Sequence, residues 1–284
     1  MRRVLILAAL ALAAGAAPAS AKSHTATAQS GSIVATIAWN TVKGDIAAKG
    51  ITMTVFDGDT QIVDATVPDN QYYTPTEVKT FGNKPVGVED FDGDGTPEVI
   101  FNFFSGGAHC CVVTYLYDGS TLLKHDFGNV GYTLGDDDGD GVSEFNTEDD
   151  NFSGGFFASY AGSIRPTRIL QYRDGAFDDS FTRDPSVKPK LEKELRRYTR
   201  YYEKAVRKVG NGNDVWEEII RSSLAAITAE DCLLGDCAPG YAKVDDALAK
   251  GLVRKSYVRL LHRKLVKWGY DSGDGSTYGG GYSG

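Results

Sequence analysis

The sequence predicts an α+β protein in which a β-rich region precedes a C-terminal helical region. Residues 22–184 are acidic, with 25 acidic and 10 basic side chains. They contain short runs in which apolar and polar residues alternate, as in strands with one buried face. Residues 185–284 are basic, with 18 basic and 13 acidic side chains. Their apolar residues recur at intervals of three and four, which is typical of one face of a helix. This change in charge and periodicity predicts sheets followed by helices.

Residues 1–21 have the composition of a secretory signal peptide. Arg2 and Arg3 precede an apolar run over 4–14, and an Ala-Ser-Ala sequence then offers a cleavage position. The mature chain is therefore predicted to begin at Lys22, outside the cytoplasm. The alternative is a retained membrane anchor, but the run is short for a bilayer span. No later run is long and apolar enough, so we expect a secreted or cell-envelope protein without a transmembrane segment.

The β-rich region, residues 22–184, is predicted to consist of short strands joined by tight turns. Asp57-Gly58 is a hairpin signal, and the predicted strands lie at 33–39, 51–56, 61–67, 99–104, 111–117, 121–123 and 130–134. One more hairpin is predicted, with a strand over 168–172, a turn at Asp174-Gly175 and a return at Phe177. About four strands per repeat is the content of a β-propeller blade, which has about 40–50 residues. The region holds three or four such units, too few for an ordinary closed propeller. A partial, propeller-like or sandwich-like assembly of sheets is therefore predicted.

An acidic loop occurs twice in this region, over 90–98 and over 136–144. Both copies read D-x-D-G-D-G-x-x-E, and they begin 46 residues apart. Carboxylates at positions 1, 3, 5 and 9, with the carbonyl of position 7, can surround one cation, and an all-oxygen cage suits calcium. Without a cation, two carboxylates ~4 Å apart repel by about 4 kcal/mol at an effective dielectric of 20. The alternative is a solvated surface turn. We predict two calcium sites, one at Asp90, Asp92, Asp94 and Glu98 and one at Asp136, Asp138, Asp140 and Glu144.

Neither loop is an EF-hand, because position 12 is Phe101 in the first copy and Thr147 in the second, where an EF-hand has Glu. The apolar residues at 99–104 instead predict a strand directly after the first loop. Both loops resemble the FG-GAP/VCBS repeats, the calcium-loop repeats of integrin-α-type propellers and of many secreted bacterial proteins. The resemblance implies that each loop lies between two strands of a blade and binds calcium. Those repeats usually have Asp at position 9, where this chain has Glu.

A wider stretch, from about residue 33 to 181, resembles a group of exported bacterial proteins of unassigned function. The resemblance rests on the acidic loops, on the segment over 105–111 that ends in Ala-His-Cys-Cys, and on the aromatic segment over 156–160. It implies export and a shared fold. It implies no reaction.

Four cysteines in an exported chain predict two disulfides. The favoured pairing is local, Cys232 with Cys237 and Cys110 with Cys111, and pairing between the two regions is the alternative. A different hypothesis makes His109, Cys110 and Cys111 soft metal ligands or a redox pair. Three consecutive side chains do not readily surround one ion, so disulfides are preferred.

The helical region, residues 185–270, is predicted to contain four helices. The first has an apolar stripe formed by Leu191, Leu195, Tyr198, Tyr202, Ala205 and Val209. Asn213 is predicted to cap the second helix, whose stripe is Trp216, Ile219, Ile220, Leu224 and Ile227. A third helix follows Pro239, and a fourth carries Tyr257, Leu260, Leu261, Leu265 and Trp268. We expect these stripes to be core. The basic faces are expected to be solvated, with contact to an anionic cell envelope as the alternative. Residues 271–284 are predicted to be a disordered Gly/Ser/Tyr-rich tail.

No catalytic signature accompanies these features. Neither G-x-S-x-G nor H-E-x-x-H occurs, and His24, His125 and His262 are scattered, so we expect them at the surface or in the core. The acidic balance argues against a nucleic-acid partner. The leading hypothesis is an extracellular binding or interaction module with structural calcium and a protein or glycan ligand. The alternatives are a hydrolase of glycan or cell-wall polymer, whose acid pair is not marked, and a redox or metal protein centred on His109.

Overall fold

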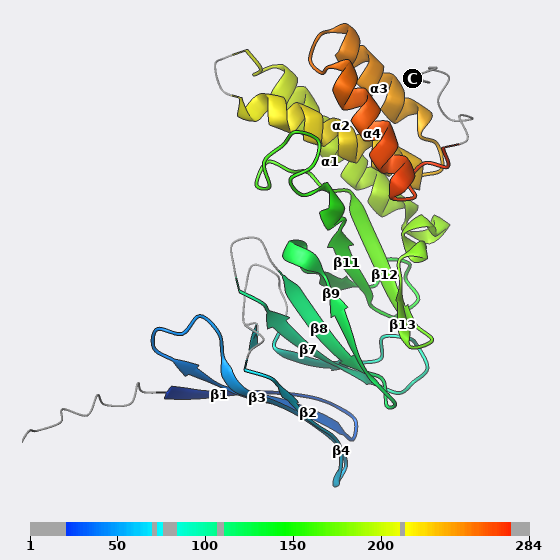
Figure 1. Ribbon diagram of the computed structural model, residues 1–284. Helices are drawn as coiled ribbons and strands as arrows, with labels where there is room; N and C mark the ends of the chain where they lie inside the picture. Colours follow the sequence, from blue (N-terminus) through cyan, green and yellow to red (C-terminus); the bar gives the residue numbers. More distant parts are fainter. Residues whose placement is uncertain (1–20, 70–72, 76–83, 107–110, 211–213, 274–284) are drawn as a thin grey trace, which may run out of the picture.

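The computed structural model describes residues 21–69, 73–75, 84–106, 111–210 and 214–273, which form three antiparallel sheets followed by four helices. Figure 1 shows the sheets stacked one after another, with the helices beyond the third sheet. The predicted α+β order is therefore confirmed. The signal peptide predicted at the N-terminus lies outside the described residues, apart from Ala21.

The first sheet is a meander in which neighbouring strands pair in chain order: β1 (Ala21–Ser30), β2 (Ile33–Val42), β3 (Lys49–Asp57) and β4 (Thr60–Val67). Buried and partly exposed residues alternate along β2 and β3. One face of the sheet is therefore core and the other faces solvent. The sequence did not predict β1, because this edge strand packs only small apolar residues, Ala26 and Ala28, against the core. His24 of β1 stacks on Trp39 at 5.1 Å between ring centroids.

The second sheet contains a four-stranded meander: β6 (Val86–Glu89), β7 (Glu98–Phe104), β8 (Val112–Tyr117) and β9 (Leu122–Asp126), with β5 (Thr74–Pro75) also paired to β7. β7 is buried on both faces. Phe101 and Phe103 pack in the core shared with the first sheet, whereas Ile100 packs in the core shared with the third sheet. A strand that is covered on both faces needs a continuous apolar run, which explains the sequence over 99–104.

The third sheet is also a meander: β10 (Thr133–Gly135), β11 (Glu144–Glu148), β12 (Thr167–Arg173) and β13 (Ala176–Asp178). The predicted strand over 130–134 was partly wrong. A short 3-10 turn, η2 (Gly128–Val130), replaces its beginning, because Gly128 and Gly131 take positive φ values of 63° and 61° that a strand does not accommodate. The sequence also missed β11, in which Phe145 is the single large apolar residue.

All four predicted helices are present in the described part of the chain: α1 (Lys188–Val206), α2 (Val215–Leu233), α3 (Ala238–Ala249) and α4 (Lys255–Lys267). Three short 3-10 turns, η3 (Asp150–Phe152), η4 (Ser180–Arg183) and η5 (Pro185–Val187), lie before α1. The predicted stripe of α1 is buried at Leu191, Tyr198, Tyr202 and Ala205. No helix within the described ranges has the length and apolar content to cross a membrane.

At the ends of the helical region one prediction is corrected, and another concerns a residue outside the described part of the chain. The residue that precedes α2 as its N-cap is Asp214, which makes no side-chain capping hydrogen bond; Asn213, the predicted cap, lies outside the described residues. The predicted tail begins too early. Asp271 is buried and accepts a hydrogen bond of 2.7 Å from the hydroxyl of Tyr241, which holds the chain against α3 beyond the end of α4.

Cys232 and Cys237 form a disulfide that joins the last turn of α2 to the residue before α3. This local pairing is confirmed. Cys111 is also disulfide-bonded, but Cys110 and His109 lie outside the described residues. The predicted pairing of Cys110 with Cys111 therefore stays a prediction.

Glu230 of α2 is a fully buried acid at the junction of the helices and the third sheet. Its Oε1 accepts a hydrogen bond of 2.8 Å from the backbone N–H of Thr167 in β12. Burial raises the pKa of Glu230 from 4.5 to about 8, against the lowering effect of the hydrogen bonds from Thr167. The folded protein therefore holds a proton on Glu230 more tightly than the unfolded chain does.

Replacing Glu230 by Gln should remove a pH-dependent loss of stability. With a raised pKa, the contribution of Glu230 is fully present below about pH 4.5 and is lost as the pH rises to about 8. In that window the free energy of unfolding of the wild type should fall, relative to Glu230→Gln, by up to about 1.4 kcal/mol per pH unit. Urea unfolding of both proteins between pH 5 and 8 measures this difference. Glu203→Gln, at an exposed position of α1, is the control, and its free energy of unfolding should change with pH as that of the wild type does. If the free energies of unfolding of Glu230→Gln and the wild type changed in parallel with pH, the prediction would be contradicted.

Candidate metal centres

Each acidic loop joins the first two strands of a four-stranded meander. The first loop connects β6 to β7 and the second connects β10 to β11. The final Glu of each loop, Glu98 or Glu144, is the first residue of the following strand. The prediction that the first loop leads directly into a strand is therefore confirmed, and the second loop does the same.

The two loops have the same internal hydrogen bonds. In both, the carboxylate at position 1 accepts from the backbone N–H groups of positions 4 and 6, at 2.7 and 2.9 Å in the first loop and at 2.7 and 3.1 Å in the second. The carboxylates at positions 3 and 5 each accept from the N–H two residues later, and Glu at position 9 accepts from the N–H of position 2. These bonds fix the backbone turn, so that the side chains at positions 1 and 3 come together.

Glycine is required at positions 4 and 6 of both loops, because the backbone there is left-handed. The φ values are 78° and 89° at Gly93 and Gly95, and 83° and 91° at Gly139 and Gly141. Residues with a Cβ rarely adopt such values. The repeated glycines of the sequence are therefore explained by the turn itself.

The structure brings three carboxylates together in each loop. Within the described residues, one group consists of Asp90, Asp92 and Asp94, and each residue offers an oxygen within 4.8 Å of the others. The second group, by the same measure, consists of Asp136, Asp138 and Glu144. The remaining predicted ligands are outside these groups: Glu98 in the first loop and Asp140 in the second. Two acidic clusters that could hold metal ions are thus present.

Glu98 lies at the buried end of the first loop, with a residue exposure of 2%. Its pKa is raised to about 7, mainly by burial and also by the neighbouring charges of Asp92, Asp90 and Asp94, although the hydrogen bond from the N–H of Phe91 lowers it. Burial likewise raises the pKa of Glu144, and the N–H of Asp137 opposes it. Both loops therefore concentrate negative charge in a place where ionised carboxylates are costly without a cation.

The two acidic loops contact each other. A Cβ added at Gly93 of the first loop would lie 3.1 Å from Cγ2 of Val142 in the second. The Ser143 hydroxyl donates a hydrogen bond of 2.5 Å to Glu89, the last residue of β6. Beneath the loops, the rings of Phe91 and Phe145 are 5.2 Å apart. The candidate centres are therefore neighbours on one edge of the stacked sheets, which the spacing of the repeats alone did not show.

The second loop also contacts the helical region. Nζ of Lys190 in α1 forms an ion pair of 2.5 Å with Oδ1 of Asp137, and it also hydrogen-bonds Asn146 of β11. Asp137 occupies position 2, where the first loop has the buried Phe91. The two copies therefore differ at position 2: the first is anchored in the apolar core, and the second by a charge from α1. Sequence reasoning did not find Lys190, because the contact spans 53 residues.

A pocket of about 630 Å³ that several charged side chains line lies between the third sheet and α1. The charges that line it are mostly paired with each other: Arg165 contacts Glu148 at 2.9 Å, and Arg197 contacts Glu194 at 2.6 Å. These pairs join the sheet to the helix and leave little free charge for a ligand. The ion pairs therefore have a structural role, which is to hold the third sheet against α1.

The remaining histidines that the structure describes contact aromatic rings or a carboxylate. His125 lies between the rings of Phe127 and Phe177, at 4.5 and 4.3 Å, and burial lowers its pKa. His262 lies 3.9 Å from the carboxylate of Asp271. Together with the stacking of His24, these contacts agree with the expectation that the histidines lie at the surface or in the core. The hypothesis centred on His109 and Cys110 concerns residues outside the described part of the chain.

Comparison with known proteins gives one distant relative. A stretch of 107 residues is 36% identical to a probable thylakoid lumen protein of Synechocystis sp. (strain ATCC 27184 / PCC 6803 / Kazusa). The match covers 33% of this chain and 31% of that protein, so the chain spans about a third of its relative. No family model matches the chain, and no solved structure matches it either.

Proposed function

We propose that this protein is an exported binding module whose β-rich region is a partial, propeller-like assembly stabilised by two calcium ions. The observation that carries the proposal is the repeated loop: both copies have the same hydrogen bonds and gather three carboxylates within 4.8 Å. Each loop lies between two neighbouring strands of its meander, and the resemblance to FG-GAP/VCBS repeats implies a loop between two strands of a blade. The relative's description as a lumen protein supports export.

The donor chemistry fits calcium. Every side chain in the two clusters is a carboxylate, with no nitrogen or sulfur donor, and hard oxygen ligands favour calcium or magnesium over zinc or copper. Asp90, Asp92, Asp94 and Glu98 would hold one ion, and Asp136, Asp138, Asp140 and Glu144 the other. Bound calcium would neutralise the loops and fix the entry to β7 and β11.

A calcium count tests this proposal. Isothermal titration of the mature protein, from Lys22 onward, should give two calcium ions per chain, and one in Asp92→Asn or Asp138→Asn. Affinities of extracellular sites, about 0.1–1 mM, would suffice. Asp126→Asn is a matched control, because Asp126 makes a similar turn, accepting from the N–H of Gly128 at 2.8 Å outside the loops; it should still bind two. Absence of calcium binding in the wild type would refute the proposal.

A further inference from the structure

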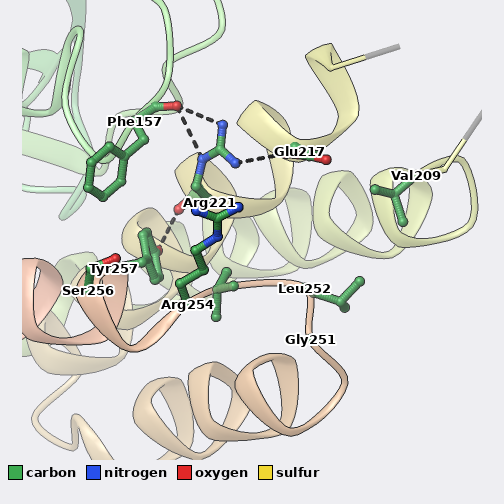
Figure 2. Close-up of a pocket in the computed structure, with 10 residues that line it drawn as sticks. Phe157, Val209, Glu217, Arg221, Gly251, Leu252, Arg254, Ser256 and Tyr257 are labelled. Atoms are coloured by element: carbon green, nitrogen blue, oxygen red, sulfur yellow. Dashed lines mark hydrogen bonds and ion pairs between the residues drawn. The ribbon is translucent and has the colours of Figure 1, made fainter. Parts of the chain in front are cut away.

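A cleft of about 370 Å³ opens on the helical region, away from the acidic loops. It is lined by α2, by the connection from α3 to α4, by the first turn of α4 and by Phe157 of the long connection between β11 and β12. Figure 2 shows these elements around two arginine side chains, Arg221 and Arg254. No predicted calcium ligand lines this cleft.

Phe157 is held at the edge of the cleft in a strained conformation. Phe156 and Phe157 both have left-handed backbones, with φ values of 55° and 57°, and this costs about 1–2 kcal/mol per residue. The ring of Phe156 is buried against Trp268, whereas Phe157 is 58% exposed. The strained turn therefore places a large aromatic ring in solvent beside the cleft, and strain of this kind concentrates at functional sites.

Arg221 fixes this conformation. Its Nε and Nη2 donate to the carbonyl oxygen of Phe157 at 3.2 and 2.8 Å, and its Nη1 donates to Glu217 at 3.3 Å. Below it, the hydroxyl of Tyr257 donates to the carbonyl of Arg221 at 2.6 Å. Arg221 is thus a positioning residue whose charge is compensated by Glu217.

Arg254 has no such compensation. It is exposed at the start of α4, and its side chain extends toward Arg221 in Figure 2. Within the described part of the chain it has no acidic partner. Because Glu217 balances only one of the two arginines, the cleft has one excess positive charge next to an apolar wall that includes Leu252 and Val253.

We propose that this cleft binds a small organic anion in which a carboxylate adjoins an apolar group, such as the carboxyl-terminal residue of a peptide or a free N-acyl amino acid. Arg254 supplies the planar fork that pairs with a carboxylate, and Phe157 packs on the apolar group. The volume is at the lower end of the range for ligand pockets, about 300–1,000 Å³. The inference rests on the proposed function, because it names the class of ligand that the binding module would take. The cleft contains none of the predicted calcium ligands.

Calorimetric titration with N-acetyl-L-phenylalanine and with acetyl-glycyl-L-phenylalanine, each compared with its carboxamide, tests this inference. The carboxylates should bind at least about tenfold more tightly than the amides. Arg254→Ala should weaken carboxylate binding by about tenfold or more, with the melting temperature unchanged. Arg259→Ala, an exposed arginine of α4 outside the cleft, should bind as the wild type does. Binding of either carboxylate supports the inference, and the ratio of their affinities distinguishes a peptide end from a free small molecule.

Equal affinity for carboxylate and amide, unchanged binding in Arg254→Ala, or no binding of either compound would overturn the inference. If inorganic phosphate bound to the cleft as tightly as the carboxylates do, the claim that an apolar group is recognised would be overturned. Unchanged binding in Phe157→Ala would overturn the same claim. The double variant Asp92→Asn with Asp138→Asn separates the two proposals. If it loses calcium and still binds the carboxylate, both proposals stand; if the wild type binds calcium and no carboxylate, only this inference fails.

Discussion

Calcium at about 10 mM, which is about 100 times a Kd at the tight end of the extracellular range of about 0.1–1 mM, is expected to raise the melting temperature of the mature protein by about 5–10 °C per site, relative to EGTA. A ligand at about 100 times its Kd stabilises the folded state by about 2.7 kcal/mol. For a chain of this size, each kcal/mol corresponds to about 2–4 °C. The gain has a local cause, because each loop gathers carboxylates around a buried Glu whose pKa is raised. A calcium titration followed by circular dichroism measures the shift.

The variants Asp92→Asn and Asp138→Asn should each lose the shift of one site. Asn removes the charge but keeps the Oδ1 that accepts from the N–H two residues later, at 3.1 Å in both loops. In EGTA, the melting temperatures of the variants should therefore be no lower than that of the wild type. Because Asn relieves the repulsion between carboxylates in the loop, their melting temperatures should rise. Asp126→Asn should keep the full calcium shift. A calcium shift of equal size in all four proteins would show that the ion acts elsewhere.

Phe145→Ala should be the most destabilising change in the β-rich region, at about 3–5 kcal/mol. Phe145 is 0% exposed. Its ring is 5.0–5.9 Å, between centroids, from four others in the core between the second and third sheets: Phe91, Phe127, Tyr132 and Phe177. The truncation leaves a cavity directly beneath both acidic loops. Urea unfolding in calcium measures the loss.

Phe157→Ala is the matched control for Phe145→Ala. It removes the same side chain from a position where 58% of the residue is exposed, so its cost should stay within about 0.5 kcal/mol. If the two variants were equally stable, the aromatic cluster would not be the core that holds the loops together.

Sequence reasoning predicted best those features whose cause is local. The four helices follow from periodic apolar stripes, and β7 follows from an uninterrupted apolar run. The acidic loops were also predictable, because their hydrogen bonds join residues no more than seven apart. Their glycines are at positions where the local turn needs a positive φ. The disulfide between Cys232 and Cys237 closes an equally short segment.

Features that depend on distant partners were missed. β1 and β11 are strands because neighbouring strands pair with them, although their own residues give a weak signal. The contact of Gly93 with Val142, and that of Lys190 with Asp137, join segments about 50 residues apart. The aromatic segment over 156–160 was noticed for its composition, but its left-handed turn depends on Arg221 of α2.

The central claim is that each acidic loop holds one calcium ion, and a crystal structure of the mature protein grown in calcium tests it most directly. An anomalous difference map at long wavelength should show two peaks per chain. One should be coordinated by oxygens of Asp90, Asp92 and Asp94, and the other by oxygens of Asp136, Asp138 and Glu144, at the 2.3–2.6 Å typical of calcium. Well-ordered loops without either peak at millimolar calcium would contradict the account.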